Sequence, residues 1–71
     1  MSSKNSISKI GKNIKRIRQE KGISQDRLSK RADLALNTIV NIESGESPNP
    51  TIETLQKIAN ALEVSIEELI K

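Results

Sequence analysis

The apolar residues of this chain recur at intervals of three and four, which is the spacing of one face of an α-helix. The clearest stripe comprises Ile52, Leu55, Ile58, Ala59 and Leu62. No segment alternates apolar and polar residues in the way that a half-buried strand would. The pattern therefore predicts an all-α fold.

Glycine and proline mark where the predicted helices end. Gly22 and Gly45 each follow a periodic segment, and glycine adopts the left-handed conformation that closes a helix without a steric penalty. Two prolines between residues 46 and 50 predict a loop. The predicted helices are a first one from about residue 9, then residues 25 to 32, 36 to 44 and 52 to 62, and a short fifth helix after Ser65.

Polar residues stand where helices need their first amide groups capped. Ser8, Ser24 and Thr51 each precede a predicted helix. Ser65 and Glu68 have the spacing of a capping box. Residues 1 to 8 are polar and unpatterned, so we expect them to form a flexible tail ahead of a single domain of residues 9 to 71.

Composition narrows both the core and the function. The 71 residues include no Cys, His, Phe, Tyr or Trp, so we expect one compact domain with an aliphatic core and no disulfides. Without His and Cys, the usual metal ligands and the commonest general base are missing. We therefore expect a protein that binds no metal or cofactor and is not an enzyme. No apolar run resembles a signal peptide or a spanning helix, so we expect a cytoplasmic protein without a membrane partner.

Charge is divided unevenly along the chain. Residues 1 to 31 hold ten basic and two acidic residues, a formal charge of +8, whereas residues 32 to 71 hold two basic and seven acidic residues, a formal charge of −5. A basic half suits a polyanion, because neutralising phosphates releases counterions. From charge alone, nucleic-acid binding and an ordinary solvated surface both remain open.

A set of residues with defined spacings matches a known family. The segment Gly22-Ile-Ser-Gln25 is followed by Leu28, Ala32, Thr38-Ile39 and Ile42-Glu-Ser-Gly45, with further matches from Pro50-Thr51 to Leu69. The chain thus resembles the Cro and phage-repressor helix-turn-helix family over about residues 10 to 70. The resemblance implies a five-helix lambda-repressor-like domain that binds double-stranded DNA sequence-specifically as a transcriptional regulator, most often a repressor or operon controller.

The third predicted helix would enter the major groove of DNA. Its outward positions are Leu36, Asn37, Val40, Asn41 and Ser44. Asn37 and Asn41 are candidate base readers, because an amide can pair with the N6 and N7 atoms of adenine. Leu36 and Val40 could contact thymine methyl groups, which would favour A·T pairs, or could complete the core.

The resemblance also assigns residues to the DNA backbone and to the scaffold. Gln25 matches a glutamine that binds phosphate, at a helix N-terminus where amides attract anions. Arg18 and Glu43 match a semi-buried structural ion pair. Weaker candidates for backbone contacts are Ser24, Thr38, Ser44, Ser47 and Asn49.

Two positions depart from the family pattern. Asp33 stands in the turn between the second and third helices, where glycine is usual, but aspartate is among the few residues that tolerate a positive φ. Ala35 replaces the usual hydroxyl cap of the third helix. We therefore expect that helix to start irregularly or to use Asp33 as its cap.

Proteins of this type usually dimerise to read two half-sites, so a homodimer on a palindromic operator is expected. The candidate interface residues are Val64, Ile66, Leu69 and Ile70, although the same residues could simply cover the core. The alternative function is a protein-interaction module or antitoxin of the same fold. Its main partner would be a protein, such as a toxin or a polymerase.

Overall fold

The computed structural model describes residues 2–46 and 50–71, with side chains from Lys9 onward. Within those residues it contains helices and no strand, so the predicted all-α fold is confirmed. The five helices are α1 (Ser2–Glu20), α2 (Gln25–Ala32), α3 (Leu36–Ser44), α4 (Ile52–Leu62) and α5 (Ile66–Ile70).

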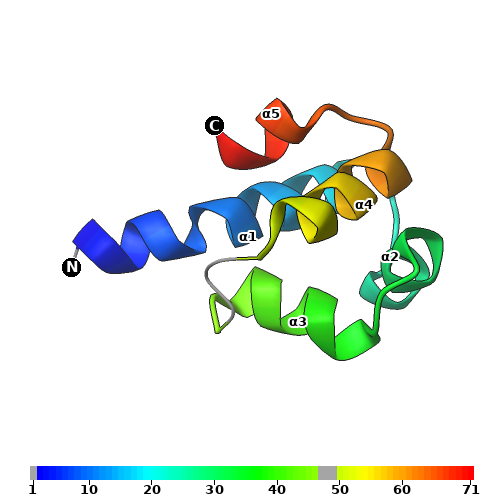
Figure 1. Ribbon diagram of the computed structural model, residues 1–71, viewed down its shortest axis with the longest axis horizontal. Helices are drawn as coiled ribbons and strands as arrows, with labels where there is room; N and C mark the ends of the chain where they lie inside the picture. Colours follow the sequence, from blue (N-terminus) through cyan, green and yellow to red (C-terminus); the bar gives the residue numbers. More distant parts are fainter. Residues whose placement is uncertain (1, 47–49) are drawn as a thin grey trace.

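The helices pack around one aliphatic core. α1 contacts α3 and α5, α2 contacts α3 and α4, and α4 contacts α5. In Figure 1, α2 and α3 lie on one side of α1 and α4, and α5 lies on the other. The fully buried side chains are Ile14, Leu28, Ile39, Ile58, Leu62 and Leu69. Each such side chain contributes about 1.5–3 kcal/mol through its removal from water.

The contact between α1 and α3 depends on one glycine. A Cβ atom added to Gly11 would overlap the carbonyl oxygen of Ile42 and would lie 3.0 Å from the Cα atom of Glu43. Backbone therefore meets backbone at this crossing, and only a residue without a side chain leaves the space. This close approach fixes where α3 sits on the longest helix.

Most predicted helix ends are confirmed. Gly22 and Gly45 have φ values of 69° and 89°, in the left-handed region. The side chains of Ser24 and Thr51 each accept a hydrogen bond from the backbone amide three residues later, at 3.0 and 3.1 Å. These caps fix the starts of α2 and α4.

The predicted start of the first helix is wrong. α1 begins at Ser2, so residues 2 to 8 extend the helix and Ser8 lies inside it instead of capping it. The extension has a simple cause: no proline or glycine precedes Gly11, so nothing in the sequence stops the helical hydrogen bonding. In Figure 1 the start of α1 projects beyond the other helices.

The predicted capping box of the fifth helix is also wrong. Ser65 does occupy the N-cap position of α5, but its side chain makes no capping hydrogen bond. The amide of Glu68 donates instead to the backbone carbonyl of Ser65, at 3.1 Å. The Glu68 carboxylate accepts a hydrogen bond from the ammonium group of Lys71, at 3.4 Å. A helix of five residues is held by these local contacts and by its packing on α1 and α4.

Candidate nucleic-acid interface

The turn between α2 and α3 is tight because Asp33 takes the left-handed conformation, with φ 59° and ψ 46°. Its amide donates to the carbonyl of Lys30 at 3.3 Å, and the amide of Leu34 donates to the carbonyl of Ser29 at 2.9 Å. These two bonds close the end of α2 as a Schellman motif does. Aspartate thus fills the position where the family usually has glycine, as expected.

α3 begins regularly but without a side-chain cap. Ala35 is its N-cap residue, and no side chain hydrogen-bonds there, so Asp33 does not serve as a substitute cap. The amide of Thr38 donates to the backbone carbonyl of Ala35 at 3.0 Å, which starts the helical pattern. The expected irregular start is therefore not observed.

α3 buries one side and presents the other, in the predicted register. Ile39 and Ile42 are 0% and 3% exposed and pack into the core. Leu36 is 42% exposed, so this leucine does not complete the core. The remaining outward residues are Asn37 and Ser44, which are exposed, and Val40 and Asn41, which are half-buried.

The amide groups of the two asparagines on α3 are available to a ligand. In the described part of the chain, the side chains of Asn37 and Asn41 make no hydrogen bond. The Ser44 hydroxyl donates to the backbone carbonyl of Asn41 at 3.1 Å. The outward face thus offers two unengaged amides beside an exposed leucine.

A three-residue cluster joins α1, α2 and α3 through Glu43. The Nε and Nη2 atoms of Arg18 donate to the two carboxylate oxygens of Glu43, at 2.8 and 3.1 Å. The Nη1 atom of Arg18 donates to the carbonyl of Ile23 at 2.8 Å. The side chains of Arg18 and Glu43 are only 11% and 4% exposed. The predicted ion pair is therefore present, two-pronged and largely removed from water.

Gln25 is the third member of the cluster, and its bond to Glu43 was not predicted from the sequence. Its Nε2 atom donates to Oε1 of Glu43 at 2.9 Å. A glutamine amide has two N–H donors, so one N–H and the carbonyl oxygen remain for another partner. Both residues belong to the same motif, but no spacing in the sequence signalled that they would meet. Glu43 thus holds the side chain that the family resemblance assigns to phosphate.

The weaker candidates for contacts with the DNA backbone differ in their exposure. Ser24 is exposed at the start of α2, although its oxygen already accepts the Arg27 amide. Thr38 is half-buried in the first turn of α3, and Ser44 is exposed in its last turn. Ser47 and Asn49 lie outside the described residues.

The predicted dimer residues mostly cover the core. Leu69 is 0% exposed, so its assignment to an interface is wrong. The amide of Asn13 donates to the Leu69 carbonyl at 2.9 Å, which ties α5 onto α1. Val64 and Ile66 are half-buried against the core, and only Ile70, at 47%, is well exposed. The reason is that a core this small needs α5 as its cover.

A further exposed aliphatic side chain was not predicted as part of a surface. Ile52, in the first turn of α4, is 72% exposed, more than any other large apolar residue in the described part of the chain. Its place in the regular stripe of α4 suggested the core. The first turn of a helix can extend past the neighbours that cover the later turns, so a sequence period cannot decide burial there.

Two kinds of site are absent from the described residues. No helix there is long and apolar enough to cross a membrane. No group of three or more Cys, His, Asp or Glu side chains there could hold a metal ion.

Sequence comparison finds similarity to one family of regulators. The model of the helix-turn-helix family matches residues 14–69. The HTH-type transcriptional regulator SinR of Bacillus subtilis (strain 168) is 38% identical over 61 residues, which are 86% of this chain. The chain spans about half the length of that regulator, 55%.

Solved structures with the same fold include two regulators. The restriction-modification controller protein C.AhdI from Aeromonas hydrophila superposes with a TM-score of 0.85 at 28% identity, over 89% of this chain and 94% of that one. SinR, the master regulator for biofilm formation, in complex with DNA, superposes with a TM-score of 0.84 at 37% identity, over 87% of this chain and 98% of that one.

Proposed function

This chain belongs to the helix-turn-helix family, and from that premise we propose that it regulates transcription by binding double-stranded DNA sequence-specifically through α3. The observation that carries the proposal is the outward face of α3. It offers two asparagine amides and an exposed leucine on a helix that a buried ion pair and a glycine contact hold in place. A major groove about 12 Å wide accepts one such helix.

Base reading would rest on three side chains. The amides of Asn37 and Asn41 can each donate to N7 and accept from N6 of adenine, which discriminates by about 1–3 kcal/mol when both bonds form. Leu36, which is 42% exposed, would lie against the methyl group of thymine. Val40 is half-buried on the same face and would add apolar contact. The operator half-site is therefore expected to contain A·T pairs at the positions under α3.

Phosphate contacts would fix the orientation of α3 in the groove. Gln25 is the strongest candidate for a phosphate contact, because Glu43 accepts one N–H of its amide and leaves the other for a phosphate oxygen. Ser24, Thr38, Ser44, Ser47 and Asn49 are proposed as further contacts. The formal charge of +8 on residues 1 to 31 supports attraction to the polyanion, and the cytoplasm is where such a regulator would meet its operator.

We also propose that the protein acts as a homodimer on an operator with two-fold symmetry. One recognition helix contacts few base pairs, and paired units read half-sites about 34 Å apart on one face of DNA. Ile70, exposed at the end of α5, is the apolar side chain most available for the contact, and the half-buried Val64 and Ile66 are further candidates.

Selection of duplex DNA from a random pool tests the proposal. The purified protein is expected to enrich a palindromic sequence with A·T pairs in each half, and native mass measurement is expected to give two chains for each duplex. Affinity for that duplex should fall steeply as salt rises, because phosphate contacts release counterions. A pool without an enriched motif, or binding that ignores salt, would reject DNA recognition by α3.

A further inference from the structure

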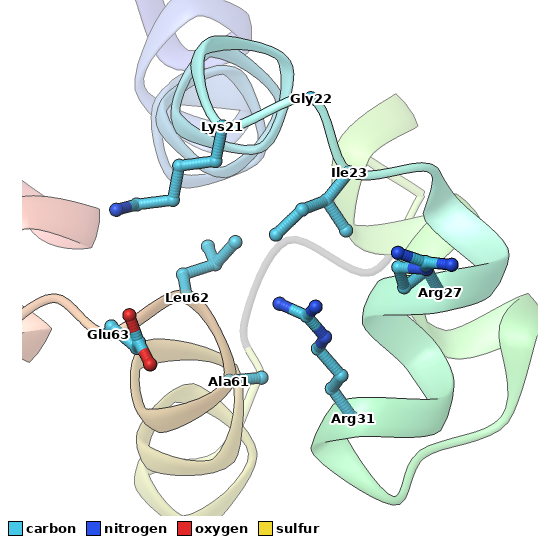
Figure 2. A pocket seen from close by; sticks show the side chains of 8 residues that line it. All are labelled: Lys21, Gly22, Ile23, Arg27, Arg31, Ala61, Leu62 and Glu63. Atoms are coloured by element: carbon cyan, nitrogen blue, oxygen red, sulfur yellow. The ribbon is translucent and has the colours of Figure 1, made fainter.

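A hollow of about 350 Å³ lies on a different part of the molecule from the outward face of α3. Its walls come from the turn that follows α1, from one side of α2, and from the end of α4 with the residue after it. Figure 2 shows the side chains that matter for its chemistry: Lys21, Ile23, Arg27, Arg31, Ala61 and Leu62. We call this feature the cationic hollow.

The cationic hollow has an excess of positive charge. It contains three basic side chains and one acidic side chain, Glu63. Among the residues that the structure describes, Arg27, Arg31 and Lys21 make no ion pair within 4.0 Å, whereas Lys30 on the same α2 helix pairs with Asp26 at 3.1 Å. The guanidinium groups in the hollow are therefore open to an external anion.

An aliphatic floor separates the charged groups. Ile23 is 7% exposed and Leu62 is 0% exposed, while Ala61 is half-buried beside them. Figure 2 shows Arg31 extending from α2 into the space between Ile23 and Ala61, with Lys21 extending on the far side of Leu62. A ligand that fits this arrangement combines a carboxylate with an aliphatic group a few atoms away.

The cationic hollow is separate from the outward face of α3. No residue of α3 lines it. Arg27 follows Gln25 by two positions, which turns its side chain by about 200° around α2. Because Gln25 points toward α3, where it bonds to Glu43, Arg27 and Arg31 point away from α3. A protein docked on DNA through α3 would leave the hollow accessible.

We propose that the cationic hollow binds an acidic segment of a partner protein. A carboxylate of that segment pairs with Arg31 and Arg27, whose planar guanidinium groups match carboxylate geometry, and an adjacent aliphatic side chain rests on Ala61 and on the methylene groups of Arg31. The volume is near the lower limit for small-molecule sites, and an exposed ion pair alone is weak. A peptide segment gains what a small anion lacks, namely apolar contact with Ala61 and with the methylene groups of the basic side chains.

Peptide selection followed by a charge-matched comparison tests this proposal without DNA, so its failure is distinguishable from failure of the proposed function. A random displayed peptide library is panned on the full chain, and the best peptide is measured by fluorescence anisotropy. Acidic-aliphatic sequences are expected. Arg31→Gln should weaken binding about tenfold, since it removes a charge-assisted contact. Lys30→Gln, which removes the same charge from the same helix outside the hollow, should leave the affinity nearly unchanged.

Further measurements test the charge of the hollow and distinguish other occupants. Glu63→Gln should tighten peptide binding about threefold, because it removes a repelling carboxylate. Citrate should compete only at far higher concentration than the peptide. DNA affinity and sedimentation should be the same for Arg31→Gln and Lys30→Gln.

Each of four results would overturn the proposal. These are a panned library without acidic peptides, equal weakening by Arg31→Gln and Lys30→Gln, citrate binding as tight as peptide binding, and a specific loss of DNA affinity or of self-association in Arg31→Gln. The last result would assign the hollow to phosphate or to a second copy of this chain. Circular dichroism melting of each variant checks that it remains folded.

Discussion

Glu43 connects the scaffold to the proposed DNA contacts. Its carboxylate accepts two hydrogen bonds from Arg18 on α1 and one from Gln25 on α2, while Glu43 itself lies on α3. Only 4% of its side chain is exposed, so water cannot replace a lost partner. The three helices are therefore held in register by one buried anion.

Substitution Glu43→Ala is expected to lower the free energy of unfolding by about 3 kcal/mol, because it leaves the Arg18 charge largely buried without its counter-charge. Urea unfolding measures the change. Glu20→Ala is the matched control: it breaks the exposed pair of Arg16 and Glu20, 3.5 Å apart, and should cost less than about 1 kcal/mol. Equal effects of the two substitutions would show that the buried pair has no special role.

Single residues were predicted best where their role depends on the local chain. The positive φ of Asp33, the caps at Ser24 and Thr51 and the pair of Arg18 and Glu43 were all expected, because turn chemistry is local and the family motif carried the pair. The bond from Gln25 to Glu43 was not, since it depends on how three helices meet in space.

At the scale of the elements, the packing of α3 on α1 fixes the proposed recognition helix. Gly11 allows the two backbones to approach until a Cβ atom would overlap the Ile42 carbonyl. Alanine favours an isolated helix over glycine by about 1 kcal/mol, so propensity and packing make opposite predictions at this position.

Gly11→Ala is expected to destabilise the protein by about 1–3 kcal/mol, the range of overpacked cores, because backbone atoms of α3 must move. Lys12→Ala, at the next and exposed position of α1, should change stability by less than about 0.5 kcal/mol. Thermal unfolding of both variants measures the difference. Stabilisation by Gly11→Ala would show that α1 and α3 do not make this close contact.

At the uncapped start of α3, a substitution is expected to raise the stability of the protein. Ala35 already has the extended backbone of an N-cap residue, with φ −68° and ψ 147°, but no oxygen to accept an amide. Ala35→Ser should stabilise the fold by about 1 kcal/mol, and Ser24→Ala, which removes an existing cap, should destabilise it by a similar amount. Urea unfolding curves test both. No gain in stability from Ala35→Ser would mean that a serine hydroxyl at this position does not reach the first amides of α3.

Helix identity and most boundaries followed from periodicity, whereas the two ends of the chain did not. α1 continues back to Ser2 because an unpatterned polar segment without glycine or proline can still be helical. Ser65 lacks its expected capping bond in a helix of only five residues. Apolar periodicity reports neither a helix made of polar residues nor the capping bonds of a helix only five residues long.

In the molecule as a whole, the short α5 covers the core more than it forms a free surface. Leu69 is fully buried, so the sequence-predicted dimer surface is reduced mainly to Ile70. Whether an apolar side chain at the end of a chain covers its own core or a partner depends on tertiary packing, which no local pattern reports. The candidate recognition face could be predicted, because it follows from the helical register of α3 alone.

Ile70→Glu is expected to weaken self-association at least tenfold, because it places a charge in the proposed dimer contact. Ile52→Glu, which puts the same charge on another exposed aliphatic residue, is the control and should leave association unchanged. Sedimentation equilibrium of both variants measures the dissociation constants. A loss confined to Ile52→Glu would move the contact to the start of α4.

The most direct test of the central claim, that α3 reads bases, is a base-by-base affinity matrix on the selected duplex for Asn37→Ala and Asn41→Ala. Each substitution should cost about 1–3 kcal/mol and relax the preference at its own base position, with other positions unchanged. Asn60→Ala, an exposed asparagine on α4, should alter neither affinity nor preference. Matrices for Asn37→Ala and Asn41→Ala that match the unaltered protein would contradict base reading by α3.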